Sequence, residues 1–265
     1  MSMQNLYSLS QQLIGKSLNQ KLQAFCEYFL GISYGPWLDG TSVLSLDDFN
    51  YDLETLDCVT YVEVVLALAT IGPQPDLDSF KAAFENLLQN LHYANGEPSF
   101  MARNHFMCID WIENNKYIIT DITNNISGNY KTAVAMIDKQ SFIKQHAIAG
   151  DKQLAIAPIE SRLKYIATNE FLDDYLEYYN KFPEVSIVNI VRPNWDLTEH
   201  IGSHLNISHL GFVFKYDQEL RFYHSTVIQK KVVHEPLFDY IARYQQSPTI
   251  KGINILAIKS DYHAR

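Results

Sequence analysis

The spacing of hydrophobic residues changes part way along this chain, and the change limits the folds it can adopt. Up to residue 92, apolar side chains recur about every 3.6 positions, as in amphipathic helices. We expect helices over 58–71, over 77–91, and over 5–30, the last as one helix or as two with a break near Gly15. Later runs rich in aromatic and β-branched residues predict strands at about 117–122, 132–137, 185–192, 208–215, 219–225, 227–234 and 250–258, with helices at 169–179 and 236–245. Helices followed by strands indicate an α+β fold with an antiparallel sheet.

Composition narrows the class of protein without identifying it. The 265 residues are 47% hydrophobic, enough for one domain over 1–265 with a helical elaboration over about 1–50. A formal net charge of −9 and the absence of a basic run argue against nucleic-acid partners. The longest apolar run, 64–71, is far shorter than the roughly 20 residues of a membrane helix, so no spanning segment is expected. Composition leaves the oligomeric state open.

Cys58 stands at the start of the helix expected over 58–71, directly after Asp57. Unpaired backbone N–H groups and the helix dipole stabilise a thiolate there, which favours a nucleophilic cysteine. A free cysteine is more often a small buried hydrophobe, and we interpret Cys26 and Cys108, both in apolar stretches, in that way. The odd number of widely spaced cysteines does not indicate a disulfide framework.

Two histidines supply the partners that such a thiol needs. His209 and His224 lie in the strands expected on either side of the polar stretch 215–219. If the turn is centred between Tyr216 and Asp217, the two histidines face each other, with Cβ atoms about 4.5–5.5 Å apart. One imidazole then serves as the base and the other orients it, as in thiol hydrolases. We interpret the histidines at 92, 146, 234 and 263 as structural.

Several motifs together resemble one enzyme family. Asp57-Cys58 at a helix start, Ser-His-Leu-Gly-Phe at 208–212 and Tyr-His-Ser at 223–225 resemble the NlpC branch of papain-like cell-wall cysteine peptidases. The segments 56–63, 103–106, 110–112 and 121–123 resemble more closely a subgroup of N-acetylmuramoyl-L-alanine amidases. One departure is the strand at 185–190, which lacks the Gly-Asp that commonly begins it.

The resemblance implies a papain-like core in which the antiparallel sheet packs against the helix that carries the nucleophile. It makes Cys58 the nucleophile, His209 the general base and His224 the orienting residue. It implies substrate contacts from Tyr34, Asp57, Arg103, Asn104, His105 and Ser208. The expected substrate is a peptidoglycan fragment (a muropeptide), cut between N-acetylmuramic acid and L-alanine, with no cofactor and no metal. At the helix start, the Cys58 backbone N–H is the expected oxyanion donor.

Three other functions remain open. An endopeptidase that cuts the stem peptide would use the same three catalytic residues with different pockets. A zinc hydrolase would use His200, His204 and His209, but two histidines four apart share a face only on a helix, and this stretch reads as a loop around Gly202. A glycan-binding module with an inert thiol would suit the 13% aromatic content. We expect the loops 32–55 and 193–207 to rim the cleft, with His200 and His204 on that rim.

The N-terminus carries information about location. Residues 1–12 have neither the cationic start nor the apolar segment of a signal peptide. The resemblance favours the bacterial cell envelope or periplasm, reached with a leader that has been removed. A cytoplasmic role in recycling wall fragments is the alternative.

Overall fold

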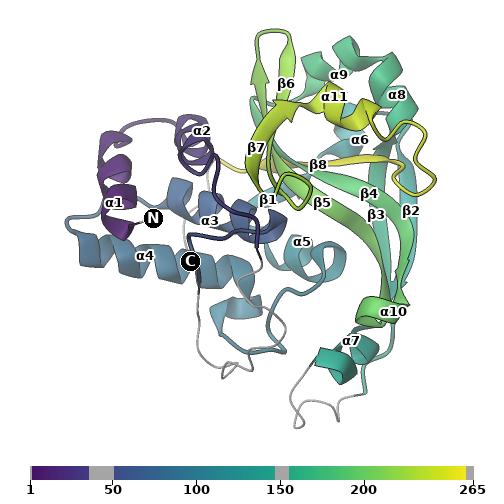
Figure 1. The fold of residues 1–265 in the computed structure, drawn as a ribbon, viewed down its shortest axis with the longest axis horizontal. Helices are drawn as coiled ribbons and strands as arrows, with labels where there is room; N and C mark the ends of the chain where they lie inside the picture. Colours follow the sequence, from purple (N-terminus) through teal and green to yellow (C-terminus); the bar gives the residue numbers. More distant parts are fainter. Residues whose placement is uncertain (1, 36–50, 147–154, 261–265) are drawn as a thin grey trace. The chain divides into compact units, whose positions relative to one another are not determined.

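The computed structural model describes residues 2–35, 51–146 and 155–260. The chain forms two compact units that alternate along the sequence. The first comprises Met1–Arg103, Phe222–His234 and Lys259–Arg265, and the second comprises Asn104–Arg221 and Glu235–Ile258. Figure 1 traces the chain from purple at the N-terminus to yellow at the C-terminus. None of the described helices is long and apolar enough to cross a membrane.

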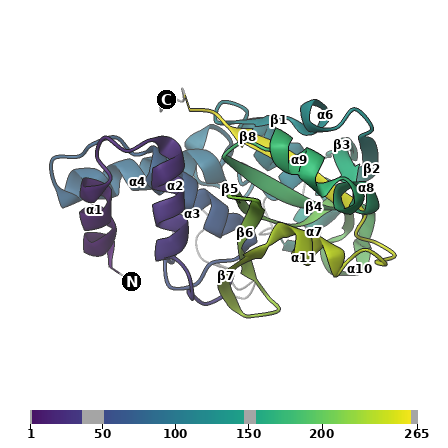
Figure 2. The same cartoon turned by 90° about the horizontal axis from the view of Figure 1, so that it is seen from above.

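Four helices make up most of the first unit: α1 (Met3–Gln12), α2 (Leu18–Tyr28), α3 (Cys58–Thr70) and α4 (Leu77–His92). Gly15, with a φ of +78°, lies between α1 and α2, which confirms the predicted break. Figure 2 shows α3 beside α2 and α4. Residues 60–69 of α3 are all buried, so this helix is the core of the unit. The short 3-10 helix η1 (Ala94–Gly96) follows α4.

The first unit also contains most of a β-hairpin. Strands β6 (Glu219–Thr226) and β7 (Lys231–Pro236) are neighbours, joined by a turn over 227–230. The strand predicted over 227–234 begins instead at Lys231, so its predicted start was wrong. Positive φ at Lys230 reverses the chain there, and Val227 and Ile228 are exposed at the tip instead of pairing. Ser33 bridges to both Thr55 and Lys231, so the segment after α2 lies between the approach to α3 and β7.

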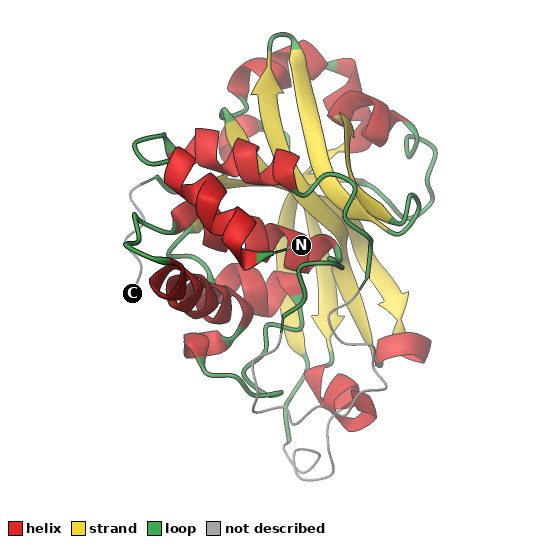
Figure 3. Cartoon of the chain, turned by 60° about the vertical axis from the view of Figure 1, so that its left-hand side comes forward, coloured by secondary structure: helices red, strands yellow, loops and turns green. Residues whose placement is uncertain are grey.

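An open antiparallel sheet forms the second unit, which confirms the predicted α+β class. Its strands are β1 (Ile119–Asp121), β2 (Lys131–Ile137), β3 (Ile159–Ala167), β4 (Val185–Leu197), β5 (Ser203–Tyr216) and β8 (Gly252–Ile258). The order is β2-β3-β8-β4-β5, with β1 paired to β8. Figure 3 shows the strands in yellow. The central strand β4 pairs with both β5 and β8, and its residues 185–191 are buried.

Short helices connect these strands. They are η2, a π-helix (Met107–Trp111), α5 (Ile112–Asn114), α6 (Thr123–Ile126), α7 (Lys139–His146), α8 (Thr168–Asp173), α9 (Tyr175–Lys181), α10 (Thr198–Ile201) and α11 (Leu237–Ala242). In Figure 1, α8, α9 and α11 lie near one end of the long strands, and α7 and α10 lie near the other. The helix predicted over 169–179 is therefore two helices.

The stretch 193–207 is not the loop that its composition predicted. Strand β4 continues to Leu197, α10 follows, and β5 begins at Ser203. Pairing of Leu197 with Ser203 and of Asp196 with His204 extends the β4–β5 ladder. Cross-strand hydrogen bonds thus override the low strand propensity of these residues. Of the other expected rim loop, 32–55, residues 36–50 lie outside the described part, as does His263.

Candidate active site

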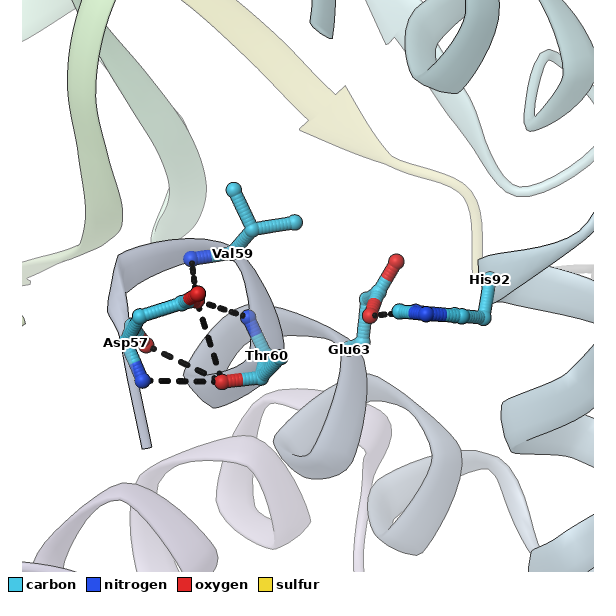
Figure 4. Close-up of polar contacts among 5 residues, drawn as sticks. All are labelled: Asp57, Val59, Thr60, Glu63 and His92. Atoms are coloured by element: carbon cyan, nitrogen blue, oxygen red, sulfur yellow. Dashed lines mark hydrogen bonds and ion pairs between the residues drawn. The ribbon is translucent and has the colours of Figure 1, made fainter. Parts of the chain in front are cut away.

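The start of α3 is built around Asp57, which caps the helix. One carboxylate oxygen, Oδ1, accepts hydrogen bonds from the amides of Val59 at 2.9 Å and Thr60 at 2.8 Å (Figure 4). In return, the Asp57 amide donates to the Thr60 hydroxyl at 2.9 Å. This reciprocal pairing is a capping box. It places Cys58 as the first residue of the helix, as predicted.

The cap determines which helix-start amides are available for other partners. Val59 and Thr60 donate to the Asp57 carboxylate, and Tyr61 donates to the Asp57 carbonyl at 3.0 Å. Burial raises the pKa of Asp57, and the hydrogen bonds from Thr60 lower it in part. The Cys58 amide directly precedes these three donors, at the first position of the helix.

Tyr34 lies close enough to Cys58 for the two to interact electrostatically. Burial raises the pKa of Tyr34 to about 12, and the negative charges of Cys58 and Asp57 contribute to the rise. The Tyr34 amide donates to the Lys230 carbonyl at 2.9 Å, which holds this segment against β7. At neutral pH the Tyr34 phenol is therefore a protonated O–H group.

His224 and its neighbour Ser225 lie on β6 in the same unit. The His224 side chain is buried and stacks on Phe222, with ring centroids 4.4 Å apart and an interplanar angle of 15°. The Ser225 hydroxyl donates to the carbonyl of Leu56 at 2.5 Å, two residues before Cys58. Ser225 belongs to the Tyr-His-Ser motif, but the motif did not indicate this contact, because the partner is 169 positions away.

A buried acid and histidine lie further along α3. Nδ1 of His92, on α4, is 2.6 Å from Oε2 of Glu63 (Figure 4). This contact agrees with the structural interpretation of His92. Arg103 is on the neighbouring segment, where it bridges to Tyr93, and its positive charge partly offsets the rise in pKa that burial causes at Tyr93.

In the second unit, His209 lies on β5 beside an irregularity in the sheet. Ile190 pairs with His209 and Val191 pairs with Ile207, so Ser208 is the extra residue of a β-bulge. Bulges bend a strand and redirect its side chains, and they are common next to active sites. The half-buried ring of His209 stacks on Tyr240 of α11, with centroids 6.2 Å apart and planes 23° from parallel. Sequence reasoning missed Tyr240.

The segment that follows Arg103 is held by polar contacts within the second unit. The side-chain carbonyl of Asn104 accepts a hydrogen bond from Asn114 at 2.7 Å. The ring of His105 packs on Phe142 of α7, with centroids 4.8 Å apart. Asp110, in η2, accepts from the Phe106 amide at 3.1 Å and is 2.7 Å from Nζ of Lys139.

The other two thiols lie in surroundings that keep them protonated. Cys26 is fully buried on α2, and burial raises its pKa far above the ordinary value. Burial also raises the pKa of Cys108 to about 11, although hydrogen bonds involving Ser161 and the 206–207 backbone oppose the rise. Neither is therefore a thiolate at neutral pH.

The histidines considered as zinc ligands lie on different elements from those expected. His200 is exposed on α10, and His204 is on β5 with Nε2 3.8 Å from Oδ1 of Asp196. Within residues 2–35, 51–146 and 155–260, no group of three His, Cys, Asp or Glu side chains is arranged to hold a metal.

The structure thus groups Tyr34, Asp57 and Cys58 in the first unit. In the second, it places Ser208 directly before His209. The turn between β5 and β6 consists of Asp217 and Gln218, so the predicted turn centre was wrong by one residue.

Comparison with known proteins identifies the family of this chain. A family model described as AmiA-like, N-acetylmuramoyl-L-alanine amidase-like, matches residues 24–250. A crystal structure of a Legionella pneumophila protein is similar to this chain, with 30% identity and a TM-score of 0.83 over 96% of this chain and 93% of the other. An N-acetylmuramoyl-L-alanine amidase from Bacteroides uniformis shares the fold, with 19% identity and a TM-score of 0.64 over 91% of this chain and 99% of the other. No curated protein matches. The chain belongs to the AmiA-like, N-acetylmuramoyl-L-alanine amidase-like family.

Proposed function

We propose that the protein is a cysteine amidase that cleaves muropeptides between N-acetylmuramic acid and L-alanine. The observation that carries the proposal is the position of Cys58, at the capped start of a buried helix. Tyr34 interacts electrostatically with it. Family membership supports a peptidoglycan amidase. The thiol mechanism and the identity of the bond are our inferences.

The reaction proceeds in two steps. The Cys58 thiolate attacks the carbonyl carbon of the lactyl–L-alanine amide, and the Cys58 amide donates a hydrogen bond to the developing oxyanion. Protonated His209 gives its proton to the alanine nitrogen as the C–N bond breaks, leaving a thioester on Cys58. His209 then takes a proton from water, and the resulting hydroxide releases the muramic acid carboxylate and regenerates the thiol group.

His224 is the proposed orienting residue for His209. The predicted direct pairing of the two histidines required a turn centred between Tyr216 and Asp217, and the turn at 217–218 removes that support. The proposed role therefore rests on the resemblance of the Tyr-His-Ser motif at 223–225 to the family pattern.

The remaining expected residues are proposed to bind substrate. Tyr34 can donate a hydrogen bond to the scissile amide because its raised pKa keeps it protonated. Arg103 carries a guanidinium suited to a carboxylate of the stem peptide. Asp57, Asn104, His105 and Ser208 are proposed as further contacts. The direct contribution of Asp57 is to shape the backbone at Cys58, because Oδ1 is already bonded to amides.

Mass spectrometry of a muropeptide digest tests this proposal. An amidase yields a sugar that lacks peptide and a stem peptide with a new L-alanine amine. A dipeptide left on muramic acid would instead indicate a stem-peptide endopeptidase, and no peptide release from any muropeptide would reject both activities. We also expect soluble muropeptides to be better substrates than intact cross-linked wall.

Cysteine variants test the nucleophile in the same assay. Cys58→Ala is expected to abolish turnover while the circular dichroism spectrum stays that of the wild type. Cys108→Ala is the matched control and should remain active, because the raised pKa of Cys108 keeps it a neutral thiol. Loss of activity in Cys108→Ala alone would show that the nucleophile is misassigned.

The proposed substrate also bears on location. Family membership favours the cell envelope or periplasm, where intact peptidoglycan is found. The preference for soluble fragments is equally compatible with recycling inside the cell. Fractionation of the native host, with the protein detected by antibody, separates the two.

A further inference from the structure

The peptide group between Leu56 and Asp57 is held at both ends. Its carbonyl oxygen accepts the Ser225 hydroxyl at 2.5 Å. Its N–H, which belongs to Asp57, donates to the Thr60 hydroxyl at 2.9 Å (Figure 4). A planar peptide bonded on both sides cannot rotate without breaking one of these bonds.

Ser225 makes the shorter of two contacts to that carbonyl. Gly35 also donates its amide to the Leu56 oxygen, but at 3.4 Å. Ser225 and Leu56 both have 0% relative exposure, so water does not replace the hydroxyl if it is removed. A buried carbonyl that loses its close donor relaxes towards whatever partner remains.

The next peptide group along the chain contains the proposed oxyanion donor. The Asp57 carbonyl and the Cys58 N–H belong to one plane, joined to the held plane only through Asp57 φ and ψ, which are −83° and −176°. The Tyr61 amide fixes the carbonyl side of this second plane at 3.0 Å. The direction of the Cys58 N–H is therefore set by two constraints: the Tyr61 bond to its own plane and, through Asp57 φ and ψ, the orientation of the Leu56–Asp57 plane.

We propose that Ser225 is a positioning residue that aims the Cys58 N–H at the oxyanion through its hydrogen bond to Leu56. The inference rests on the proposed function, because it gives a role to a donor of the acyl-transfer step. Ser225 touches neither substrate nor the reacting atoms in this scheme. Its effect passes through two peptide planes of the first unit.

This role differs from simple support of the fold in a measurable way. Attack on an amide generates an oxyanion, whereas alkylation of Cys58 by iodoacetamide displaces iodide and generates none at carbon. A misdirected Cys58 N–H should slow amide cleavage and leave alkylation almost unchanged. Loss of the general fold would slow both together.

The experiment compares Ser225→Ala with Thr226→Val in the full-length protein. Thr226 is the next hydroxyl on β6, and it accepts from the Ile228 amide at 3.2 Å within the local turn. For Ser225→Ala we expect kcat to fall about 10- to 100-fold, the scale of a misplacement of up to 1 Å, with KM within about twofold. The iodoacetamide rate at Cys58 should stay within about twofold of the wild type. Thr226→Val should keep kcat near the wild-type value.

Two further variants keep the test decisive. Ser225→Thr retains the hydroxyl and should restore most of the lost kcat. Ser225→Cys, close to serine in volume but a weaker donor, should give an intermediate kcat, and it replaces Ser225→Ala if that variant does not fold. The inference is overturned if Ser225→Ala or Ser225→Cys matches Thr226→Val in kcat. It is also overturned if alkylation slows as much as turnover. An active Cys58→Ala enzyme would instead reject the proposed function.

Discussion

Oε2 of Glu63 lies 2.6 Å from Nδ1 of His92, and both side chains are buried. The pair joins α3, the helix that begins with Cys58, to α4. Glu63 is five residues after Cys58 and fixes the middle of α3 against its neighbour. The orientation of the helix start therefore depends in part on a contact remote from the thiol.

Removing one member of this pair should strongly destabilise the protein. Glu63→Ala removes a hydrogen-bond acceptor from a buried histidine, and leaving a buried polar group unsatisfied costs about 1–3 kcal/mol. Glu63→Gln should cost less, because its amide oxygen can still accept from Nδ1. Urea unfolding followed by circular dichroism measures the difference. Glu113→Gln, which breaks the exposed pair with Lys116, is the control and should change stability by less than about 0.5 kcal/mol.

The three cysteines should differ in how readily iodoacetamide alkylates them at a given pH. At about pH 7.5, iodoacetamide should label Cys58 and leave Cys26 and Cys108 unmodified, as peptide mass spectrometry will show. The pKa of Cys108 is raised from 9.0 to about 11, so its neutral form stabilises the fold fully below pH 9. That stability is lost as the pH rises from 9 towards 11.

A variant that lacks this thiol checks the sign of the effect. Between pH 9 and 11, the free energy of unfolding should fall less in Cys108→Ala than in the wild type. An equal loss in both proteins would show that titration of Cys108 does not contribute. Labelling of Cys108 at neutral pH in the folded protein would contradict the raised pKa of its thiol.

His224 should tolerate substitutions that keep a hydrogen-bonding side chain. His224→Asn and His224→Gln can still bond a ring nitrogen of His209, so they should keep more activity than His224→Ala. Steady-state rates on a muropeptide, with melting temperatures measured in parallel, test this order. Equal losses in all three variants would remove the basis for an orienting role.

Activity should depend on the aromatic ring of Tyr240, which stacks on His209, and not on the Tyr240 hydroxyl. Tyr240→Phe keeps the aromatic face and should retain most activity, whereas Tyr240→Ala frees the His209 ring and should lower kcat about 10-fold or more. Tyr244→Phe is a matched control, because Tyr244 packs on Tyr240. A fully active Tyr240→Ala enzyme would show that His209 is oriented without the stack.

Local patterns were sufficient to predict most of the elements that frame the site. Periodic apolar residues and caps located α2, α3 and α4, and aromatic and β-branched runs located β4, β5 and β6. Strand β3 was missed because its sequence, Ile-Glu-Ser-Arg-Leu-Lys-Tyr-Ile-Ala, gains its pairing from β2 and β8, which lie elsewhere in the sequence. The strand ends near Leu197 and Ser203 were missed for the same reason.

Within the site, the sequence identified residues that act through their immediate neighbours. Cys58 could be placed at a helix start because the periodic apolar residues of that helix follow it directly in the sequence. The contacts of Ser225 and Tyr240 could not be predicted in this way, because their partners, Leu56 and His209, are distant in sequence. The bulge at Ser208 depends on a register shift that no local pattern specifies.

The hairpin of β6 and β7 ties the start of α3 to a part of the chain that is synthesised much later. Ser225, which bonds the Leu56 carbonyl, follows it by 169 positions. Val232, which bonds the 31–32 backbone, also lies on this late hairpin. A nascent chain that has not yet reached β6 therefore lacks both contacts, and under the proposed scheme its Cys58 N–H is not yet aimed at the oxyanion.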